Sequence, residues 1–167
     1  SEIILNLKTY DLHSITLTGG EPLLYPGFIK ELKNFVDIPL YLETNSTLPK
    51  NAKKIKTCVD FVAADIKIDY PEFYENSIET LKILKDKNLF VKIVVLPGTE
   101  SKTIEKVAKD LKNHDLDVPL ILQPVTPHGE VKEKPNTKKI LNLADTCGKY
   151  LSDVRIVPQV HKLMGVL

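Results

Sequence analysis

The sequence has few of the residues that build disulfides or clustered metal sites. Its 167 residues include two cysteines, one methionine and no tryptophan. Cys58 and Cys147 are far apart in the sequence, which excludes a disulfide framework and a metal-ligand pair of local spacing. We interpret them as two buried thiols. The only methionine is Met164 and the chain opens at Ser1, so we expect a fragment or a processed product.

Long hydrophobic runs and an excess of one charge are also missing. No apolar run approaches the roughly 20 residues that cross a bilayer, and no secretory signal opens the chain. We therefore expect a cytoplasmic protein that does not bind membranes. The 23 basic residues nearly balance the 22 acidic ones, for a formal charge of +1. Without a basic block interleaved with aromatic residues, nucleic acid is not an expected partner.

The hydrophobic pattern alternates between two periods along the whole chain. Short apolar, β-branched runs predict six strands, over residues 14–18, 39–43, 60–66, 90–96, 119–123 and 153–157. Helical periodicity predicts helices over residues 2–10, 27–36, 50–56, 71–87, 102–113 and 136–151. Serial alternation of this kind demands a parallel sheet with right-handed crossovers, either open or closed into a barrel. We expect one α/β domain over residues 1–167, with residues 124–135 as an active-site loop.

The most informative local feature is the turn Thr18-Gly19-Gly20-Glu21-Pro22, directly after the first predicted strand. Side chains that bind ligands gather at the carboxyl ends of parallel strands. The glycines allow backbone to approach a ligand closely, and Pro22 favours an extended conformation at Glu21. An ionised carboxylate among unpaired carbonyls accepts hydrogen bonds only, so its natural ligand is an ammonium group. An ordinary glycine-rich turn is the alternative.

The other strand ends are polar as well, which suits a small, highly functionalised ligand. The polar groups at these ends are Glu43, Thr44, Asn45, Asp65, Lys67, Gln123, Gln159 and His161. Residues 43–45 suit sugar hydroxyls or a purine edge, or form a helix cap and turn. Asp65 and Lys67 bind a carboxylate or ribose, or form a simple ion pair, and Lys67 could instead form an imine. His128 is held between a proline and a glycine, where exposure to solvent is the commoner outcome, and the four histidines lack the spacing of a zinc site.

Five segments together resemble the radical S-adenosylmethionine (SAM) enzymes, and most of all their 7-carboxy-7-deazaguanine synthase branch. The segments are residues 18–24 (TGGEPLL), 43–45 (ETN), 65–67 (DIK), 123–124 (QP) and 158–163 (PQVHKL). The Gly-Gly-Glu segment is the most specific of them, and the Pro-Gln-x-His-Lys segment points to the branch. The related enzymes that install glycyl radicals share the Gly-Gly-Glu and Asp-x-Lys patterns, so they remain an alternative.

The resemblance implies a partial (βα)6 TIM-like barrel and a role for each rim residue. Gly19, Gly20 and Glu21 would receive the methionyl ammonium of SAM. Thr44, Asn45 and Lys67 would lie near its ribose or carboxylate, or near the substrate. The residues implied for the pterin- or purine-like substrate are Glu43, Gln123, Gln159 and His161. The chemistry implied is hydrogen abstraction that converts a pterin-derived substrate to a deazapurine, a step toward modified tRNA bases.

The sequence departs from the family at the iron-sulfur cluster. The family holds a 4Fe-4S cluster with three closely spaced cysteines after the first strand, and Cys58 and Cys147 provide neither the count nor the spacing. We expect the cluster loop and first strand to precede Glu2, and the chain alone to be inactive. A non-catalytic nucleoside- or protein-binding domain is the alternative. The resemblance also implies a homodimer, and an uncovered edge at residues 14–18 favours one.

Overall fold

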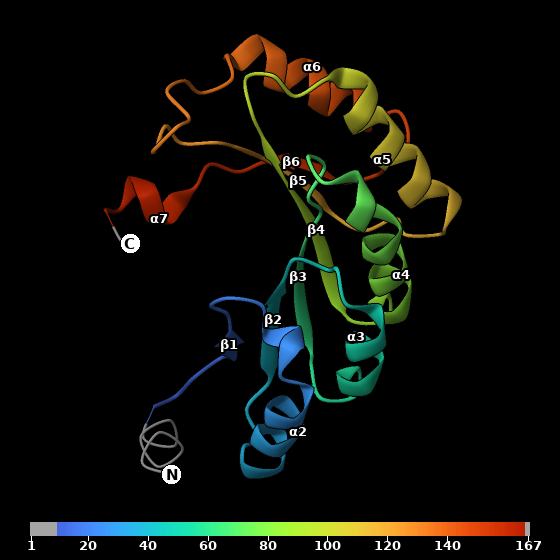
Figure 1. The fold of residues 1–167 in the computed structure, drawn as a ribbon, viewed down its shortest axis with the longest axis vertical. Coiled ribbons are helices and arrows are strands. Elements are labelled where there is room, and N and C mark those ends of the chain that lie inside the picture. Colours follow the sequence, from blue (N-terminus) through green and yellow to red (C-terminus); the bar gives the residue numbers. More distant parts are fainter. Residues whose placement is uncertain (1–9, 166–167) are drawn as a thin grey trace. The chain divides into compact units, whose positions relative to one another are not determined.

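The structure is a computed structural model that describes residues 10–165, except the side chains of residues 161 and 163. Strands and helices alternate along the chain (Figure 1). The strands are β1 (Ile15–Leu17), β2 (Leu40–Thr44), β3 (Phe61–Asp65), β4 (Asn88–Val95), β5 (Leu120–Pro124) and β6 (Val154–Ile156). The helices are η1 (Pro22–Leu24), α2 (Pro26–Phe35), α3 (Pro49–Ile55), η2 (Pro71–Phe73), α4 (Tyr74–Leu84), α5 (Ser101–Asn113), α6 (Thr137–Cys147) and α7 (Val160–Leu163).

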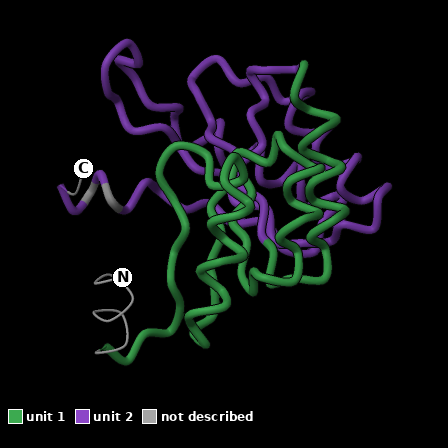
Figure 2. The backbone as a smooth tube through the Cα atoms, turned by 60° about the horizontal axis from the view of Figure 1, so that its bottom comes forward, with its two compact units in different colours: residues 1–64, 72–89 green, residues 65–71, 90–167 purple. Residues whose placement is uncertain are grey.

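The chain divides into two compact units, coloured green and purple in Figure 2. Unit 1 comprises Ser1–Ala64 and Glu72–Leu89, and unit 2 comprises Asp65–Pro71 and Phe90–Leu167. The single domain expected over residues 1–167 stays a prediction, because compactness does not show whether either unit folds alone.

Unit 1 is a parallel sheet covered by a row of helices. β1 pairs with β2 and β2 with β3, all parallel, and the register places Leu42 beside Leu17 and Val62. α3 lies between α2 and α4 (Figure 1). The core is made by side chains that are at most 3% exposed: Ile29, Leu40, Leu42, Ile55, Val62, Ala64, Ile78 and Leu81. Their burial fixes which face of the sheet the helices cover.

Unit 2 repeats this arrangement. β4 pairs with β5 and β5 with β6, again parallel, and α5 and α6 lie side by side. Its core residues are at most 5% exposed: Val91, Ile93, Val95, Ile104, Leu111, Leu120, Leu122, Ile140 and Leu143. On β4 the buried positions alternate with partly buried ones, so one face of the strand meets the helices and the other does not.

The α/β class and the parallel strands are as predicted. The short helices η1 and α7 were not predicted, and the other differences lie at the ends of elements. The helix predicted over residues 71–87 is divided into η2 and α4 and ends at Leu84. β4 starts earlier than predicted because the Asn88 N–H donates to the Asp60 carbonyl. The helix predicted over residues 2–10 lies outside the described residues except for Tyr10. Among the described residues, no helix is long and apolar enough to span a membrane.

Candidate cofactor and substrate site

The Gly-Gly-Glu turn has the backbone that its sequence predicts. Gly19 and Gly20 have φ angles of +85° and +58°, and nothing lies within 4 Å of a Cβ added at either. Both are in the left-handed region that glycine adopts at little cost. Glu21 is extended, with φ −128° and ψ 108°, as expected for a residue before proline. The turn therefore exposes backbone and directs the Glu21 side chain by local geometry alone.

The Glu21 carboxylate joins the end of β1 to the end of β2. Its Oε1 accepts hydrogen bonds from the Leu23 N–H at 2.9 Å and the Thr44 hydroxyl at 2.8 Å. Its Oε2 accepts from the Asn45 N–H at 2.7 Å. The residue is only 8% exposed. Glu21 is thus a structural link between two strand ends.

This network limits how much of the Glu21 carboxylate can meet a ligand. A carboxylate offers about four acceptor positions, and the chain itself occupies three of them. One position remains, on Oε2. An ammonium group would receive a single bond from Glu21 and would need further acceptors, which the carbonyl oxygens of Gly19 and Gly20 can supply. The turn still fits an ammonium, with the backbone making a larger contribution than predicted.

The residues after β2 form a turn around Thr44 and Asn45. The Thr44 hydroxyl accepts from the Ser46 N–H at 3.0 Å, and Asn45 Oδ1 accepts from the Thr47 N–H at 3.1 Å and the Thr47 hydroxyl at 2.8 Å. The turn that the sequence offered as the alternative role of residues 43–45 is therefore present. The Asn45 side-chain amide donates to no described residue, so its N–H groups can meet a ligand.

Ser46 follows Thr44 and Asn45 in this turn. It is fully buried at a φ of 63°, and its hydroxyl has no hydrogen-bond partner among the described residues. A non-glycine residue in the left-handed region is uncommon and shows that the turn constrains the backbone here.

Glu43, the next predicted ligand group, is exposed, and its Oε2 accepts a long 3.4 Å bond from the Thr18 hydroxyl. Burial raises the pKa of nearby Tyr41, and the Glu43 charge raises it further.

In unit 2, Asp65 and Lys67 form an ion pair with 2.5 Å between Asp65 Oδ2 and Lys67 Nζ. Their side chains are 16% and 42% exposed, respectively. Asp65 Oδ1 is buried and has no hydrogen-bond partner among the described residues. A protonated amine held by a carboxylate is a poor nucleophile, so the ion pair favours ligand binding by Lys67 over imine formation.

The remaining predicted residues lie in unit 2 at different depths. Gln123 is partly buried on β5, with no hydrogen bond from its side chain to any described residue. Gln159 Oε1 accepts from the Thr126 N–H at 2.8 Å, so it ties the segment after β6 to the loop after β5. His161 lies in α7, and its side chain is outside the described part of the structure. His128 is exposed on a small hairpin with Val131.

Cavities open beside these strand ends. A cavity of about 360 Å³ in unit 1 is lined by Leu17, Thr18, Gly19 and Pro22 with aromatic neighbours. A cavity of about 620 Å³ in unit 2 begins at Ile68, directly after Lys67, and reaches the start of α5. Each unit therefore has room for a ligand beside a predicted site residue.

The described cysteines do not fit a 4Fe-4S cluster. Cys58 lies in unit 1 and is partly exposed, and Cys147 lies in unit 2 and is fully buried. Burial raises the pKa of the Cys147 thiol to about 11, which disfavours the thiolate that binds iron. Within the described part of the chain, no group of three His, Cys, Asp or Glu side chains could hold a metal ion.

Comparison with known proteins decides the family. The sequence profile of the Radical SAM superfamily matches residues 1–111, which include the Gly-Gly-Glu turn and the Asp65–Lys67 pair. The chain belongs to the radical SAM superfamily. This superfamily in general uses SAM and a 4Fe-4S cluster.

Three curated relatives of this radical SAM protein are each named 7-carboxy-7-deazaguanine synthase. The protein from Methanocaldococcus jannaschii is 35% identical, over 96% of this chain and 70% of its own length. The Methanothermobacter thermautotrophicus protein is 34% identical, over 99% of this chain and 75% of its own. The Geobacter sulfurreducens protein is 35% identical, over 92% of this chain and 64% of its own. The branch indicated by the sequence motifs is confirmed.

A solved structure supports the fold. The crystal structure of Streptococcus suis SuiB superposes with a TM-score of 0.61 at 12% identity, over 95% of this chain. The chain spans 42% of the length of SuiB. This likeness is consistent with a partial (βα)6 TIM-like barrel, as predicted.

Proposed function

We propose that this chain supplies the SAM-binding and substrate-binding residues of a radical SAM enzyme of the 7-carboxy-7-deazaguanine synthase type. The observation that carries the proposal is the Gly-Gly-Glu turn, whose open backbone and single spare carboxylate position suit an ammonium group. The named relatives support the reaction class. The substrate would be a small pterin- or purine-like molecule, and the product a deazapurine.

The chain's own residues would bind and orient the two small molecules. Gly19, Gly20 and Glu21 would hold the methionyl ammonium, and Thr44 and Asn45 would hold Glu21 in place. Lys67 would meet a carboxylate or a ribose hydroxyl. The residues proposed to contact the substrate are Glu43, Gln123, Gln159 and His161. Bound SAM would supply hydrogen-abstraction chemistry.

These 167 residues alone are proposed to be inactive. Three close thiolates are needed for the cluster, and the chain contains two cysteines, of which one is fully buried.

The test is SAM binding by the chain and its Glu21→Gln variant, measured by isothermal titration calorimetry. Replacing a carboxylate that binds an ammonium should weaken binding by roughly tenfold or more. Glu31→Gln, which changes an exposed carboxylate on α2, is the matched control and should bind like the parent chain. Unchanged SAM affinity in a folded Glu21→Gln variant would refute the proposed SAM site. Cleavage of SAM by the parent chain would refute its proposed inactivity.

A further inference from the structure

Asn51, on α3, is a polar residue that the proposed function has not used. It lies in the first turn of this helix and is partly buried. Its amide Nδ2 donates a hydrogen bond to the Leu23 carbonyl at 2.9 Å, although the two residues are 28 positions apart in the sequence. Its Oδ1 accepts from Lys54 Nζ at 3.0 Å. Because an ammonium can only donate, this second bond fixes the amide with its N–H groups toward Leu23.

Leu23 connects Asn51 to the carboxylate of the Gly-Gly-Glu turn. The Leu23 N–H donates to Glu21 Oε1 at 2.9 Å, so Glu21 binds one backbone group of this residue and Asn51 binds the other. Leu23 belongs to η1, which has only three residues. A helix this short is not stable by itself, so its position depends on contacts from other elements. Asn51 supplies one of these contacts from α3.

The segment between the end of β2 and the start of α3 supports the Glu21 turn at three points, all within unit 1. The Thr44 hydroxyl and the Asn45 N–H bind the carboxylate itself. Asn51 binds the residue whose N–H holds Oε1. The acceptor position left for a ligand is on Oε2, so its direction depends on how firmly Oε1 is held. A shift of η1 would turn the carboxylate and the spare position with it.

We propose that Asn51 is a positioning residue for the ammonium group of SAM, which acts through Leu23 and Glu21 without touching the ligand. The inference rests on the proposed function, because that function assigns the ammonium to Glu21. A carboxylate held by supporting hydrogen bonds loses little freedom when a ligand binds, whereas one on a looser turn must first be ordered. Asn51 therefore affects binding of the amino-acid part of SAM and not of its nucleoside part.

The experiment compares SAM with 5′-methylthioadenosine, which lacks the amino acid, by calorimetry on the full 167-residue chain. Asn51→Leu keeps the approximate shape of the side chain and removes both of its hydrogen bonds. It should weaken SAM binding by about three- to tenfold and leave 5′-methylthioadenosine within about twofold. Asn51→Gln keeps an amide donor and should restore most of the lost affinity. Asn76→Leu changes an exposed asparagine of α4 and should bind both probes like the parent chain.

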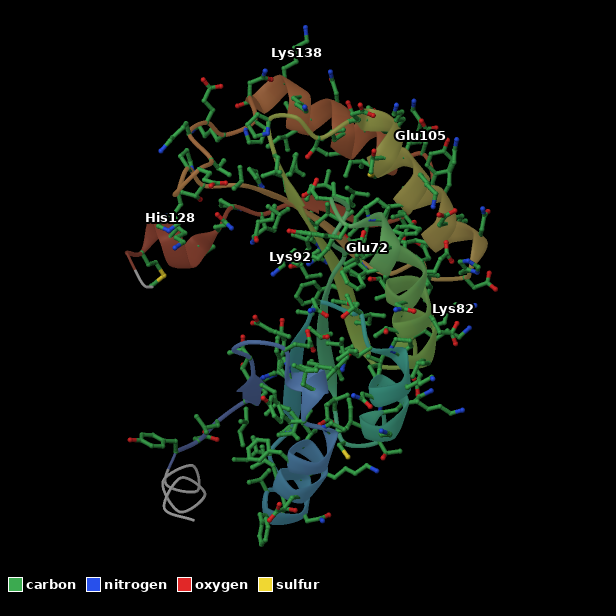
Figure 3. The ribbon with its side chains drawn as sticks, in the orientation of Figure 1. Glu72, Lys82, Lys92, Glu105, His128 and Lys138 are labelled. Atoms are coloured by element: carbon green, nitrogen blue, oxygen red, sulfur yellow. The ribbon has the colours of Figure 1, made fainter. Side chains whose placement is uncertain are left out.

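A double-mutant cycle tests the route through Glu21. If Asn51 acts through this carboxylate, Asn51→Leu should have little further effect on SAM affinity in a chain that already carries Glu21→Gln. Lys54→Met releases only the Oδ1 side of the amide and should cause a smaller loss than Asn51→Leu. Lys82→Met, the matched control, removes a lysine of α4 that points away from the strands in Figure 3, and it should cause no loss.

Hydrogen exchange followed by NMR tests the positioning without a ligand. The amides of Leu23 and Asn45 both donate to Glu21, and in Asn51→Leu they should exchange roughly threefold faster or more. The Leu40 amide donates to Asp60 and should exchange as in the parent chain.

Four results would each refute the role of Asn51 and leave the proposed function standing. They are unchanged exchange at the amides bound to Glu21, unchanged SAM affinity, an equal loss of both probes, and additive losses in the double-mutant cycle. A parent chain that binds no SAM would refute the proposed function and the role of Asn51 with it.

Discussion

At the scale of single residues, Glu21 shows how one carboxylate can serve the fold and a ligand together. Three hydrogen bonds within 2.9 Å fix its position before any ligand arrives. Such fixed acceptors lose little entropy when a ligand binds, which favours affinity. The remaining acceptor position is then the only part of the side chain that discriminates between ligands. The proposed loss on Glu21→Gln should therefore combine a weaker ammonium contact with a disturbed turn.

A second prediction at this scale concerns the two cysteines. Burial raises the pKa of Cys147 to about 11, so at pH 8 roughly one thiol in a thousand is ionised. Iodoacetamide at pH 8 should therefore label partly exposed Cys58 in the folded chain and leave Cys147 unlabelled, as followed by mass spectrometry of peptides. In urea both should react.

The raised pKa also gives the Cys147 prediction a pH dependence. The fold favours the neutral Cys147 thiol over the thiolate. Burial of this thiol therefore contributes fully to stability below the usual pKa of 9.0, and the contribution is lost as pH rises toward 11. Equal labelling of both cysteines in the folded chain at pH 8 would contradict the buried position of Cys147.

At the scale of elements, the strands could be predicted from sequence and the site contacts could not. Runs such as residues 90–96 combine β-branched residues with a two-residue period, and the core strands of both units follow from that pattern. Local rules also predicted the extended Glu21 before Pro22. The bonds from Glu21 to Thr44 and Asn45 join distant parts of the chain, and no local pattern encodes such partners.

An element-scale prediction concerns the start of α6. Asn136 precedes this helix, and its side chain accepts from the Lys139 N–H at 2.8 Å. Asn136→Ala removes this cap and should lower the free energy of unfolding by about 1 kcal/mol, measured by urea denaturation. Asn136→Asp keeps an acceptor and should stay close to the parent chain. A fully stable Asn136→Ala variant would show that the bond adds nothing to α6.

At the scale of the whole molecule, one group of exposed apolar side chains lies in unit 1 on η1 and α2. Among the described residues β1 is paired only with β2, so its other edge offers free backbone groups. The exposed side chains of η1 and α2 and the residue between them are Leu24, Tyr25, Phe28 and Phe35, each at least 54% exposed. A formal charge of +1 opposes self-association very little. We propose that a second copy of the chain covers this surface, as the expected homodimer requires.

Sedimentation equilibrium tests the homodimer. The parent chain should sediment as a dimer that dissociates on dilution, because free strand edges and apolar patches associate reversibly. Phe28→Lys places a charge in the patch and should shift the equilibrium to monomer. Tyr70→Lys changes an equally prominent aromatic residue in unit 2, 54% exposed, and should leave the dimer intact. A parent chain that stays monomeric at the highest concentrations would refute the homodimer. A Phe28→Lys variant that dimerises normally would show that the interface lies elsewhere.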